Sequence, residues 1–245
     1  MDKIRRAQLV LQEMSKAIAE ALEKNSIPYM LAYGTLLGAV RHGGFIPWDD
    51  DFDFYLFDDC YEEAVECLRR ELPDTMFVED AKSEPLYFHA WAHVKDINSR
   101  AESGMYPHDN LYSHHGISVD LYRIKKLRLS ELRSWVNSEN GKYIERRREK
   151  GLISREEYER RIERLNQNKS VSQTVGDDRE VYSLRTNFKW FELDEVFPLK
   201  RMRFEDRDFN VPNEYEKILV KLYGDYMKLP LESERHGHYD TLEFY

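Results

Sequence analysis

The sequence contains no long hydrophobic run, and this absence excludes an integral membrane protein. None of its 245 residues lie in an apolar stretch approaching the about 20 residues that a membrane-spanning helix needs. The first residues, Met1 to Arg6, lead into a polar amphipathic stretch without the apolar core of a secretory signal. We therefore expect a cytoplasmic protein, with at most peripheral association at the inner face of the membrane.

Cysteine is scarce, and negative charge outweighs positive charge. The two cysteines, Cys60 and Cys67, fall seven residues apart in a predicted helix, roughly 10 Å along its axis, which is too far for a disulfide. Neither C-x-x-C nor H-E-x-x-H occurs, so the usual zinc patterns are missing. Asp and Glu outnumber Lys and Arg by 46 to 37. Nucleic acid is therefore a poor partner, because phosphate neutralisation needs a basic face.

What is present is a mixture of helix and strand patterns. Apolar residues at helical spacing predict a helix over residues 2–25, and alternating acidic and apolar residues predict a strand over residues 51–56. Further strands are expected at 29–33, 76–79, 87–96 and 117–122, further helices at 36–41, 58–71 and 214–223, and an irregular loop at 97–116. We expect one α/β (α+β) domain over residues 1–245, with a mixed sheet flanked by helices and a C-terminal extension.

Residues 129–170 stand out as a strongly charged, helix-favouring insertion. Opposite charges three and four residues apart, as in residues 145–150 and 155–161, are typical of a pair of solvated helices. The alternative interpretation is a basic clamp for an anionic acceptor.

The densest chemical signal is a group of four carboxylates within five residues: Asp49, Asp50, Asp51 and Asp53. Such carboxylates repel one another unless a cation neutralises them. On a strand, Asp51 and Asp53 point to the same side with their side chains about 6.5–7 Å apart. Oxygen ligands of this kind suit Mg²⁺ or Mn²⁺ rather than zinc.

Two other interpretations of the acidic segment are weaker. Asp49, Asp51 and Asp53 copy the first three ligand positions of a calcium loop, but the sixth position is Phe54 instead of Gly and the twelfth is Cys60 instead of Glu. A solvated acidic face is disfavoured because such faces do not usually alternate with phenylalanine.

Asp120 is the predicted third carboxylate. It lies on the alternating strand 117–122. Taken alone, an aspartate on a strand more often makes an edge or loop contact, so this prediction depends on Asp51 and Asp53. Three carboxylates on neighbouring strands can hold two ions around a phosphoryl centre. Asp120 could also take the proton from an attacking hydroxyl.

Gly34 and Thr35 open a predicted helix directly after a strand. Free backbone N–H groups and the helix dipole at such a position can hold phosphate, although the pair alone is more often an ordinary turn. Its position about sixteen residues before the D-x-D pair makes the signal more specific. Arg41 could grip phosphate with two hydrogen bonds, with a surface ion pair as the alternative.

Residues 33–53, which read YGTLLGAVRHGGFIPWDDDFD, closely resemble the LicD family of phosphocholine transferases, which is similar to the fukutin-related ribitol-phosphate transferases. Weaker matches occur at 118–120, 224–230 and 236–238. The resemblance implies a nucleotidyltransferase-like fold, with Gly34 and Thr35 at the phosphates and Asp51 and Asp53 on metal. It also implies a CDP-alcohol donor and a cell-surface glycan acceptor, such as lipopolysaccharide or teichoic acid, or a lipid-linked precursor of one.

The expected function is therefore a metal-dependent transfer of an alcohol phosphate, such as phosphocholine, from a CDP-alcohol to a glycan or a lipid-linked glycan. Asp51, Asp53 and Asp120 would hold Mg²⁺ or Mn²⁺, and Arg41 and Lys95 would neutralise phosphate charge. Two alternatives stay open. One is a nucleotidyltransferase that moves NMP from an NTP, and the other is a binding protein that keeps the fold without catalysis.

Histidines are common near the predicted pocket. Their default interpretation is a core or rim position, with hydrogen-bond donation to phosphate as the alternative. The histidines concerned are His89, His93, His114, His115, His236 and His238.

Overall fold

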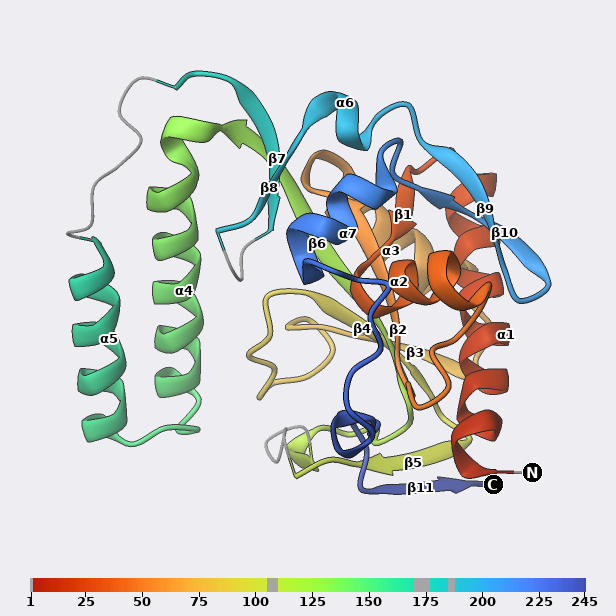
Figure 1. The fold of residues 1–245 in the computed structure, drawn as a ribbon. Helices are drawn as coiled ribbons and strands as arrows, with labels where there is room; N and C mark the ends of the chain where they lie inside the picture. Colours follow the sequence, from red (N-terminus) through yellow and green to blue (C-terminus); the bar gives the residue numbers. More distant parts are fainter. Residues whose placement is uncertain (1, 105–109, 170–176, 185–187) are drawn as a thin grey trace.

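A computed structural model describes residues 2–104, 110–169, 177–184 and 188–245 and shows a mixed sheet surrounded by helices (Figure 1). The α-helices are α1 (Lys3–Lys24), α2 (Tyr33–His42), α3 (Tyr61–Glu71), α4 (Leu132–Glu149), α5 (Arg155–Lys169), α6 (Leu193–Val196) and α7 (Tyr215–Tyr223). The strands are β1 (Tyr29–Leu31), β2 (Phe52–Phe57), β3 (Met76–Glu79), β4 (Ala92–Asp96), β5 (Ser99–Glu102), β6 (Ser118–Arg128), β7 (Glu180–Leu184), β8 (Trp190–Glu192), β9 (Lys200–Phe204), β10 (Arg207–Val211) and β11 (Thr241–Phe244). The predicted α+β class is confirmed.

The main sheet is built around the long strand β6. Within the described residues its strand order is β1-β2-β6-β4-β3, and β7 and β8 extend it beyond β6. Strands β2 and β6 run parallel, whereas every other neighbouring pair is antiparallel. Strands β9 and β10 form a hairpin, and β5 pairs with β11. The parallel pair at the centre brings the acidic segment next to the strand that contains Asp120.

The core follows directly from the residue pattern. Helix α1 buries an apolar stripe spaced three or four residues apart. Strand β2 is buried along its whole length. Its Phe52 ring packs edge-on against Phe45 and Phe204, with ring centroids 5.9 and 5.2 Å apart. These contacts fix β2 rigidly, and so they also fix the carboxyl groups at its start.

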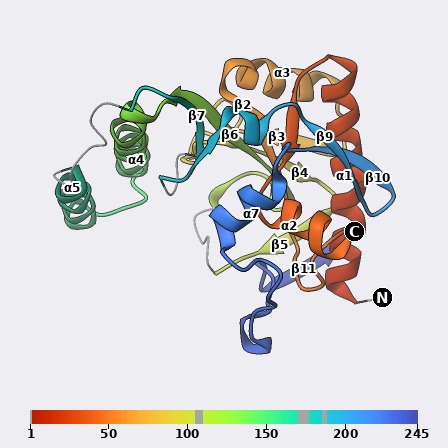
Figure 2. The same cartoon turned by 45° about the horizontal axis from the view of Figure 1, so that its top comes forward.

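Helices α4 and α5 stand side by side at one side of the sheet, apart from the other helices (Figures 1 and 2). They share a small core of their own, formed by Ile144, Ile153 and Leu165. The pair of charged helices expected within residues 129–170 is therefore present as α4 and α5. Across the described ranges, no helix is both long and apolar enough to cross a lipid bilayer.

Two predictions near β4 were wrong. The strand expected at residues 87–96 begins only at Ala92, and the loop expected at 97–116 contains β5. Strand β5 forms because β11, at the far end of the chain, supplies its hydrogen-bond partners. Such long-range pairing leaves no local pattern. The two cysteines are free thiols.

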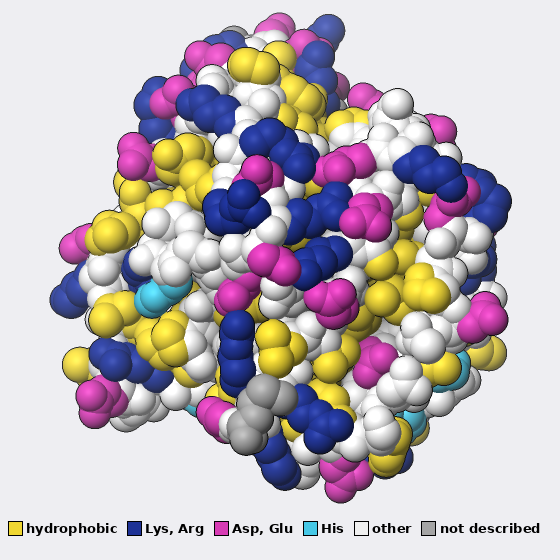
Figure 3. Space-filling model, turned by 90° about the vertical axis from the view of Figure 1, so that its right-hand side faces the viewer, with side chains coloured by type: hydrophobic (Ala, Val, Ile, Leu, Met, Phe, Trp, Pro, Cys, Tyr) yellow, Lys and Arg dark blue, Asp and Glu magenta, His cyan; other side chains and the backbone are white. Residues whose placement is uncertain are grey.

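The face formed by α1 and the β9–β10 hairpin is held by ion pairs. Arg5 contacts Glu205 at 3.0 Å, and Arg207 contacts Glu20 and Glu23 at 2.6 and 2.9 Å. Figure 3 shows basic and acidic side chains intermixed over this side of the molecule. The face therefore offers no continuous field of one sign to a charged partner.

Candidate active site

Four ionisable side chains lie in a row across the main sheet. Asp53 of β2 lies opposite Asp120 of β6, which in turn pairs with His93 of β4, and His93 pairs with Glu79 of β3. Directly opposed residues of neighbouring strands point to the same face. The sheet therefore gathers three carboxyl groups and one imidazole from four separate segments of the chain.

Asp53 is the buried end of this row. Only 4 % of its surface is exposed, and its Oδ1 has no hydrogen-bond partner within the described part of the chain. Burial, reinforced by the Asp51 and Asp120 carboxylates, raises the pKa of Asp53 well above its usual range. A buried carboxylate with a free oxygen is an arrangement that a bound cation would stabilise.

Asp51 lies just before β2 and next to Asp49. The two carboxyl groups share a hydrogen bond, and the pKa of each lies above its usual range, mainly because of burial. Burial is the main cause that raises the pKa of Asp51, and the charge of Asp49 adds to it. The Asp51 side chain is still 26 % exposed, so it remains reachable from solvent.

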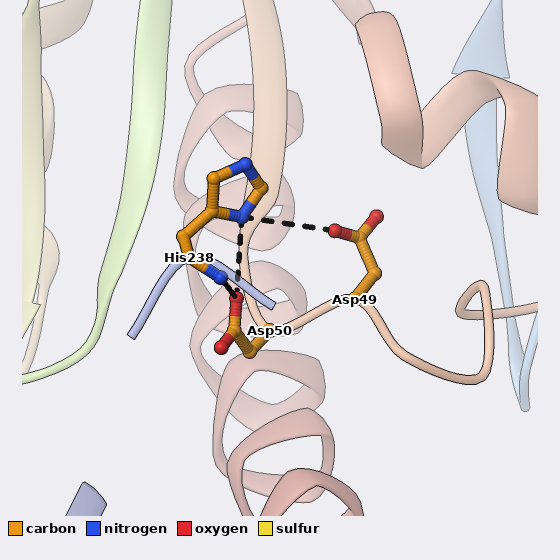
Figure 4. A group of neighbouring side chains, drawn as sticks. All are labelled: Asp49, Asp50 and His238. Carbon is orange, nitrogen blue, oxygen red and sulfur yellow. Dashed lines mark hydrogen bonds and ion pairs between the residues drawn. The ribbon is translucent and has the colours of Figure 1, made fainter. Parts of the chain in front are cut away.

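Asp50 holds the C-terminal segment against the acidic segment. Its Oδ1 accepts the backbone N–H of His238 at 2.7 Å, and its Oδ2 accepts that of Tyr239 at 3.2 Å. Gly237 fits so closely that a Cβ there would lie 2.1 Å from Asp50 Oδ2. We call this contact between Asp50 and residues 237–239 the Asp50 clasp. It places the His238 ring beside the acidic segment (Figure 4).

The His238 ring lies among three carboxyl groups. Its Nδ1 is 3.2 Å from Asp50 Oδ1, 3.3 Å from Asp51 Oδ2 and 3.9 Å from Asp49 Oδ1. The hydrogen bond to Asp50 raises the pKa of His238 to about 9, against the opposing effect of burial. The raised pKa favours the imidazolium form, in which His238 is a counter-charge to the carboxyl groups that surround it.

One set of three potential metal ligands in the described ranges has its ligand atoms all within 4.8 Å of one another: Asp49, Asp50 and His238. Asp50 already accepts two backbone N–H groups in the Asp50 clasp, and the set as a whole has the ligand types that could hold a cation. The predicted ligands Asp51, Asp53 and Asp120 share one region of the fold, but they are not gathered to within that distance.

Asp120 is linked to two further side chains. Its Oδ2 accepts the Tyr122 hydroxyl at 2.9 Å, and its Oδ1 lies 3.5 Å from His93 Nε2. The opposite ring nitrogen of His93 lies 3.2 Å from Glu79 Oε2. Burial opposes charge on His93, but Asp120 and Glu79 together raise the pKa of His93 above its ordinary value. These contacts orient the Asp120 carboxyl group.

Gly34 and Thr35 lie in the first turn of α2, which begins at Tyr33, earlier than the predicted start at residue 36. A Cβ at residue 34 would lie 3.0 Å from Asp49 Oδ2, so Gly34 adjoins the acidic segment. Thr35 is buried, and its Oγ1 accepts the backbone N–H of Asp53 at 2.8 Å. The structure thus places Thr35 where it positions Asp53.

The two predicted phosphate-binding cations lie in different surroundings. Lys95 is 6 % exposed and lines a hollow together with Asp51 and Asp120. Arg41 donates from Nη1 to the Tyr226 carbonyl at 2.9 Å, near the far end of α2. Lys95 is therefore brought to the acidic residues, whereas Arg41 contacts the segment after α7.

Two hollows open onto the acidic residues. Trp91, Tyr122 and His238 contribute to both. The inner hollow, of about 120 Å³, is further lined by Asp51, Lys95, His93, Asp120, His89 and His115. The outer hollow, of about 520 Å³, is further lined by Gly34, Trp48, Asp49, Asp51, Asp53 and His236. Asp51 borders both, so a ligand could reach it from either side.

Sequence reasoning missed two residues and one long-range contact that complete the site. Tyr122 could have been found, because it lies two positions after Asp120 on a strand and so faces the same side. Glu79 and the contact of Asp50 with the C-terminal segment could not, since each depends on pairing between distant segments. His114, by contrast, packs against the Phe77 ring at 4.1 Å and lines neither hollow.

Residues 26–121 match a family model described as LicD/FKTN/FKRP, nucleotidyltransferase domain. The lipopolysaccharide cholinephosphotransferase LicD of Haemophilus influenzae is 27% identical over 261 aligned positions, covering 96% of both chains. The ribitol 5-phosphate transferase FKRP of Homo sapiens is 43% identical over 47 residues, which are 19% of this chain and 10% of FKRP.

The matched range contains all seven predicted site residues: Gly34, Thr35, Arg41, Asp51, Asp53, Lys95 and Asp120. The likeness to LicD extends beyond that range over nearly the whole chain. The resemblance recognised in residues 33–53 is thus confirmed, because residues 26–121 match the nucleotidyltransferase domain model of LicD/FKTN/FKRP.

Proposed function

We propose that the protein transfers an alcohol phosphate from a CDP-alcohol donor to a glycan or lipid-linked glycan acceptor. The observation that carries the proposal is the placement of Asp53 opposite Asp120, with Asp51 beside them on the wall of both hollows. The relatives support the same reaction class, because one is a cholinephosphotransferase and the other a ribitol 5-phosphate transferase. We place the reaction in the cytoplasm, where CDP-alcohols would be met.

Asp51, Asp53 and Asp120 are the proposed ligands of Mg²⁺ or Mn²⁺. These ligands suit Mg²⁺ or Mn²⁺, because they are carboxylate oxygens and include the Asp53 Oδ1, which has no hydrogen-bond partner among the described residues. When bound, the ion supplies positive charge that stabilises the charge developing on the transferred phosphoryl group. The raised pKa values of Asp51 and Asp53 support this assignment, because a bound cation would relieve the repulsion between these buried, closely spaced carboxylates.

The remaining roles fall to other side chains. We assign Asp120 as the base that receives the proton of the acceptor hydroxyl, because Tyr122 and His93 hold its carboxyl group in place. The acceptor oxygen forms a new bond to phosphorus, and the bond from phosphorus to the CMP oxygen breaks. Lys95 and the N-terminal turn of α2 at Gly34 would hold phosphate oxygens. The phosphate role of Arg41 is supported by the family resemblance alone.

The alternative function is nucleotidyl transfer from an NTP, and the description of the matching family model favours it. The same carboxylates would serve both reactions, because each displaces a group at phosphorus. The leaving group separates them: CMP departs in the proposed reaction and pyrophosphate in the alternative.

The experiment compares CDP-choline, CDP-ethanolamine, CDP-ribitol and CDP-glycerol with CTP, each with Mg²⁺ and a lipopolysaccharide extract. CMP release from one CDP-alcohol, lost in Asp53→Asn but retained in Asp59→Asn, is the expected result. Asp59 serves as the control because it is an exposed residue just after β2. Pyrophosphate release from CTP would instead establish the alternative, and full turnover by Asp53→Asn would remove the proposed metal site.

A further inference from the structure

A third hollow lies between the sheet and α4, next to the site already described. It has a volume of about 430 Å³, within the range of small-molecule binding sites. Tyr33, Trp91 and Tyr122 line both this α4 hollow and the outer hollow, so the two are neighbours. The Tyr122 ring forms part of its wall while the Tyr122 hydroxyl contacts Asp120 at 2.9 Å. One side chain therefore separates the α4 hollow from the proposed base.

The α4 wall of this hollow is unusual for a helix face turned toward the protein. Trp135, Glu139, Lys142 and Arg146 are spaced four, three and four residues apart, so they form one stripe along α4. Ile144 of α4 packs against α5, and Leu132 and Val136 pack against β6 and β7 in an apolar cluster that Trp135 of the stripe joins. A polar, aromatic-containing stripe facing a cavity indicates a surface made to contact a polar ligand.

Positive charge exceeds negative charge in the α4 hollow, although the whole chain has a formal charge of −9. Its charged lining residues are the basic Arg123, Lys125, Lys142 and Arg146 and the acidic Asp58 and Glu139. Asp58 pairs with both Arg123 and Lys125, at 3.2 and 3.3 Å, and Glu139 pairs with Lys142 at 2.7 Å. No acid of the lining is thereby paired with Arg146.

Arg146 has binding capacity that its present contacts leave unused. Its Nε donates to the Phe88 carbonyl at 3.2 Å, and its buried Nη2 has no hydrogen-bond partner among the described residues. A buried guanidinium N–H without an acceptor is costly unless a ligand supplies one. Phosphate is the acceptor that best matches the guanidinium fork, and the neighbouring Trp91 and Trp135 rings can pack against a sugar ring.

We propose that the α4 hollow binds the acceptor, and that the acceptor is a phosphorylated saccharide whose phosphate is held by Arg146 and Lys142. This inference rests on the proposed function, which leaves the outer hollow beside Gly34 to the nucleotide donor. An acceptor in the α4 hollow would approach Asp120 past Tyr122, from a different side than a donor held at Gly34. The family model ends at residue 121, so the α4 wall is supplied by a part of the chain outside the matched domain.

The test measures binding of glucose 6-phosphate, glucose 1-phosphate, glucose and inorganic phosphate by calorimetry. We expect a sugar phosphate to bind about tenfold more tightly than glucose or phosphate, the scale of one charge-assisted contact. Preference for the 6-phosphate would indicate a phosphate substituent on the glycan, and preference for the 1-phosphate would indicate the phosphate that links a sugar to a carrier. Equal affinity for glucose and both sugar phosphates would overturn the proposal.

Variants locate the binding. Arg146→Gln and Lys142→Gln should each weaken sugar-phosphate binding by about tenfold. Lys142 is 60% exposed, so its variant tests the site even if Arg146→Gln disturbs folding. The control is Arg155→Gln, which removes the same charge from an exposed position of α5 and should bind normally. Unchanged binding in both Arg146→Gln and Lys142→Gln would refute the assignment, as would displacement of the sugar phosphate by CMP.

The two proposals can fail separately. Sugar-phosphate binding should persist in EDTA and in Asp53→Asn, because the α4 hollow does not include Asp53. If the sugar phosphate binds through Arg146 but no CDP-alcohol releases CMP, the proposed reaction is refuted and the sugar-phosphate site in the α4 hollow is supported. If CMP is released but sugar-phosphate affinity does not change in Arg146→Gln and Lys142→Gln, the proposed reaction is supported and the proposed acceptor site is refuted.

Discussion

The buried carboxylate of Asp50 accepts the backbone N–H of His238 at 2.7 Å, although 188 residues separate them in the chain. Through this bond the last segment of the protein becomes part of the acidic site. Asp50 itself is 1 % exposed. Its role is therefore to hold the C-terminal segment, while its neighbours Asp49 and Asp51 face the imidazolium that this segment brings.

Gly237→Ala should open the Asp50 clasp, because the new Cβ would lie 2.1 Å from Asp50 Oδ2. We expect transfer activity to fall at least about tenfold, since His238 would leave its position among the carboxyl groups. The control is Gly141→Ala in α4, where the Cβ would meet Leu165 at an ordinary 3.6 Å. That variant should keep its activity and gain about 0.5–1 kcal/mol of stability by denaturant unfolding. Normal kinetics for Gly237→Ala would contradict the role of the clasp.

Asp53→Asn should stabilise the metal-free protein near neutral pH while removing its response to metal. The folded-state pKa of Asp53 is raised above the unfolded value of 3.8, so its ionisation costs stability as pH rises through that window. The neutral amide avoids this cost. A melting temperature higher than that of the parent in EDTA, with no further rise on adding Mg²⁺, is the expected pair of results. Each 1 kcal/mol corresponds to about 2–4 °C for a chain of this size.

Metal affinity should rise with pH. Because Asp51 and Asp53 both have raised pKa values, protons compete with the cation for their oxygens. The apparent Mg²⁺ dissociation constant should therefore fall between pH 5 and 8, by up to about tenfold per pH unit for each proton displaced. Calorimetry in buffers of different ionisation enthalpy would detect the released protons. A dissociation constant independent of pH would show that these carboxyl groups are already ionised before metal binds.

Thr35→Val should destabilise the protein, whereas Thr35→Ser should not. Valine removes the Oγ1 that accepts the Asp53 N–H at 2.8 Å and leaves a buried donor unpaired. The expected cost is about 1–3 kcal/mol in urea unfolding. Serine keeps the acceptor, so its loss should be well below that of valine. If Thr35→Val unfolds like the parent but binds the CDP-alcohol more weakly, while Thr35→Ser binds it normally, the hydroxyl serves phosphate instead of β2.

Much of the local structure could be predicted from residue order. The apolar stripe of α1 and the alternation in β2 are repeats of period 3.6 and 2, and such periods act within a few residues. The acidic segment and the adjacent Gly34 could be recognised for the same reason, since their chemistry is contained in one short stretch. The family resemblance over residues 33–53 came from this stretch too.

Other features depend on contacts between distant segments. Strand β5 forms only because β11 pairs with it, and local propensity did not reveal it. The order of strands likewise decides that His93 and Glu79 extend the row from Asp53 and Asp120. Register across a sheet is set by the pairing of whole strands, which no single segment encodes.

Residue order alone determined which chemistry this protein carries: clustered carboxylates, a glycine at the start of a helix and two charged helices of undecided purpose. Folding decided where that chemistry operates. It turned Thr35 toward Asp53, joined Asp50 to His238 and set the stripe of α4 across a cavity from β6. The reason is physical, because the energies of burial, hydrogen bonding and charge depend on which atoms meet in space, and long-range packing determines those meetings.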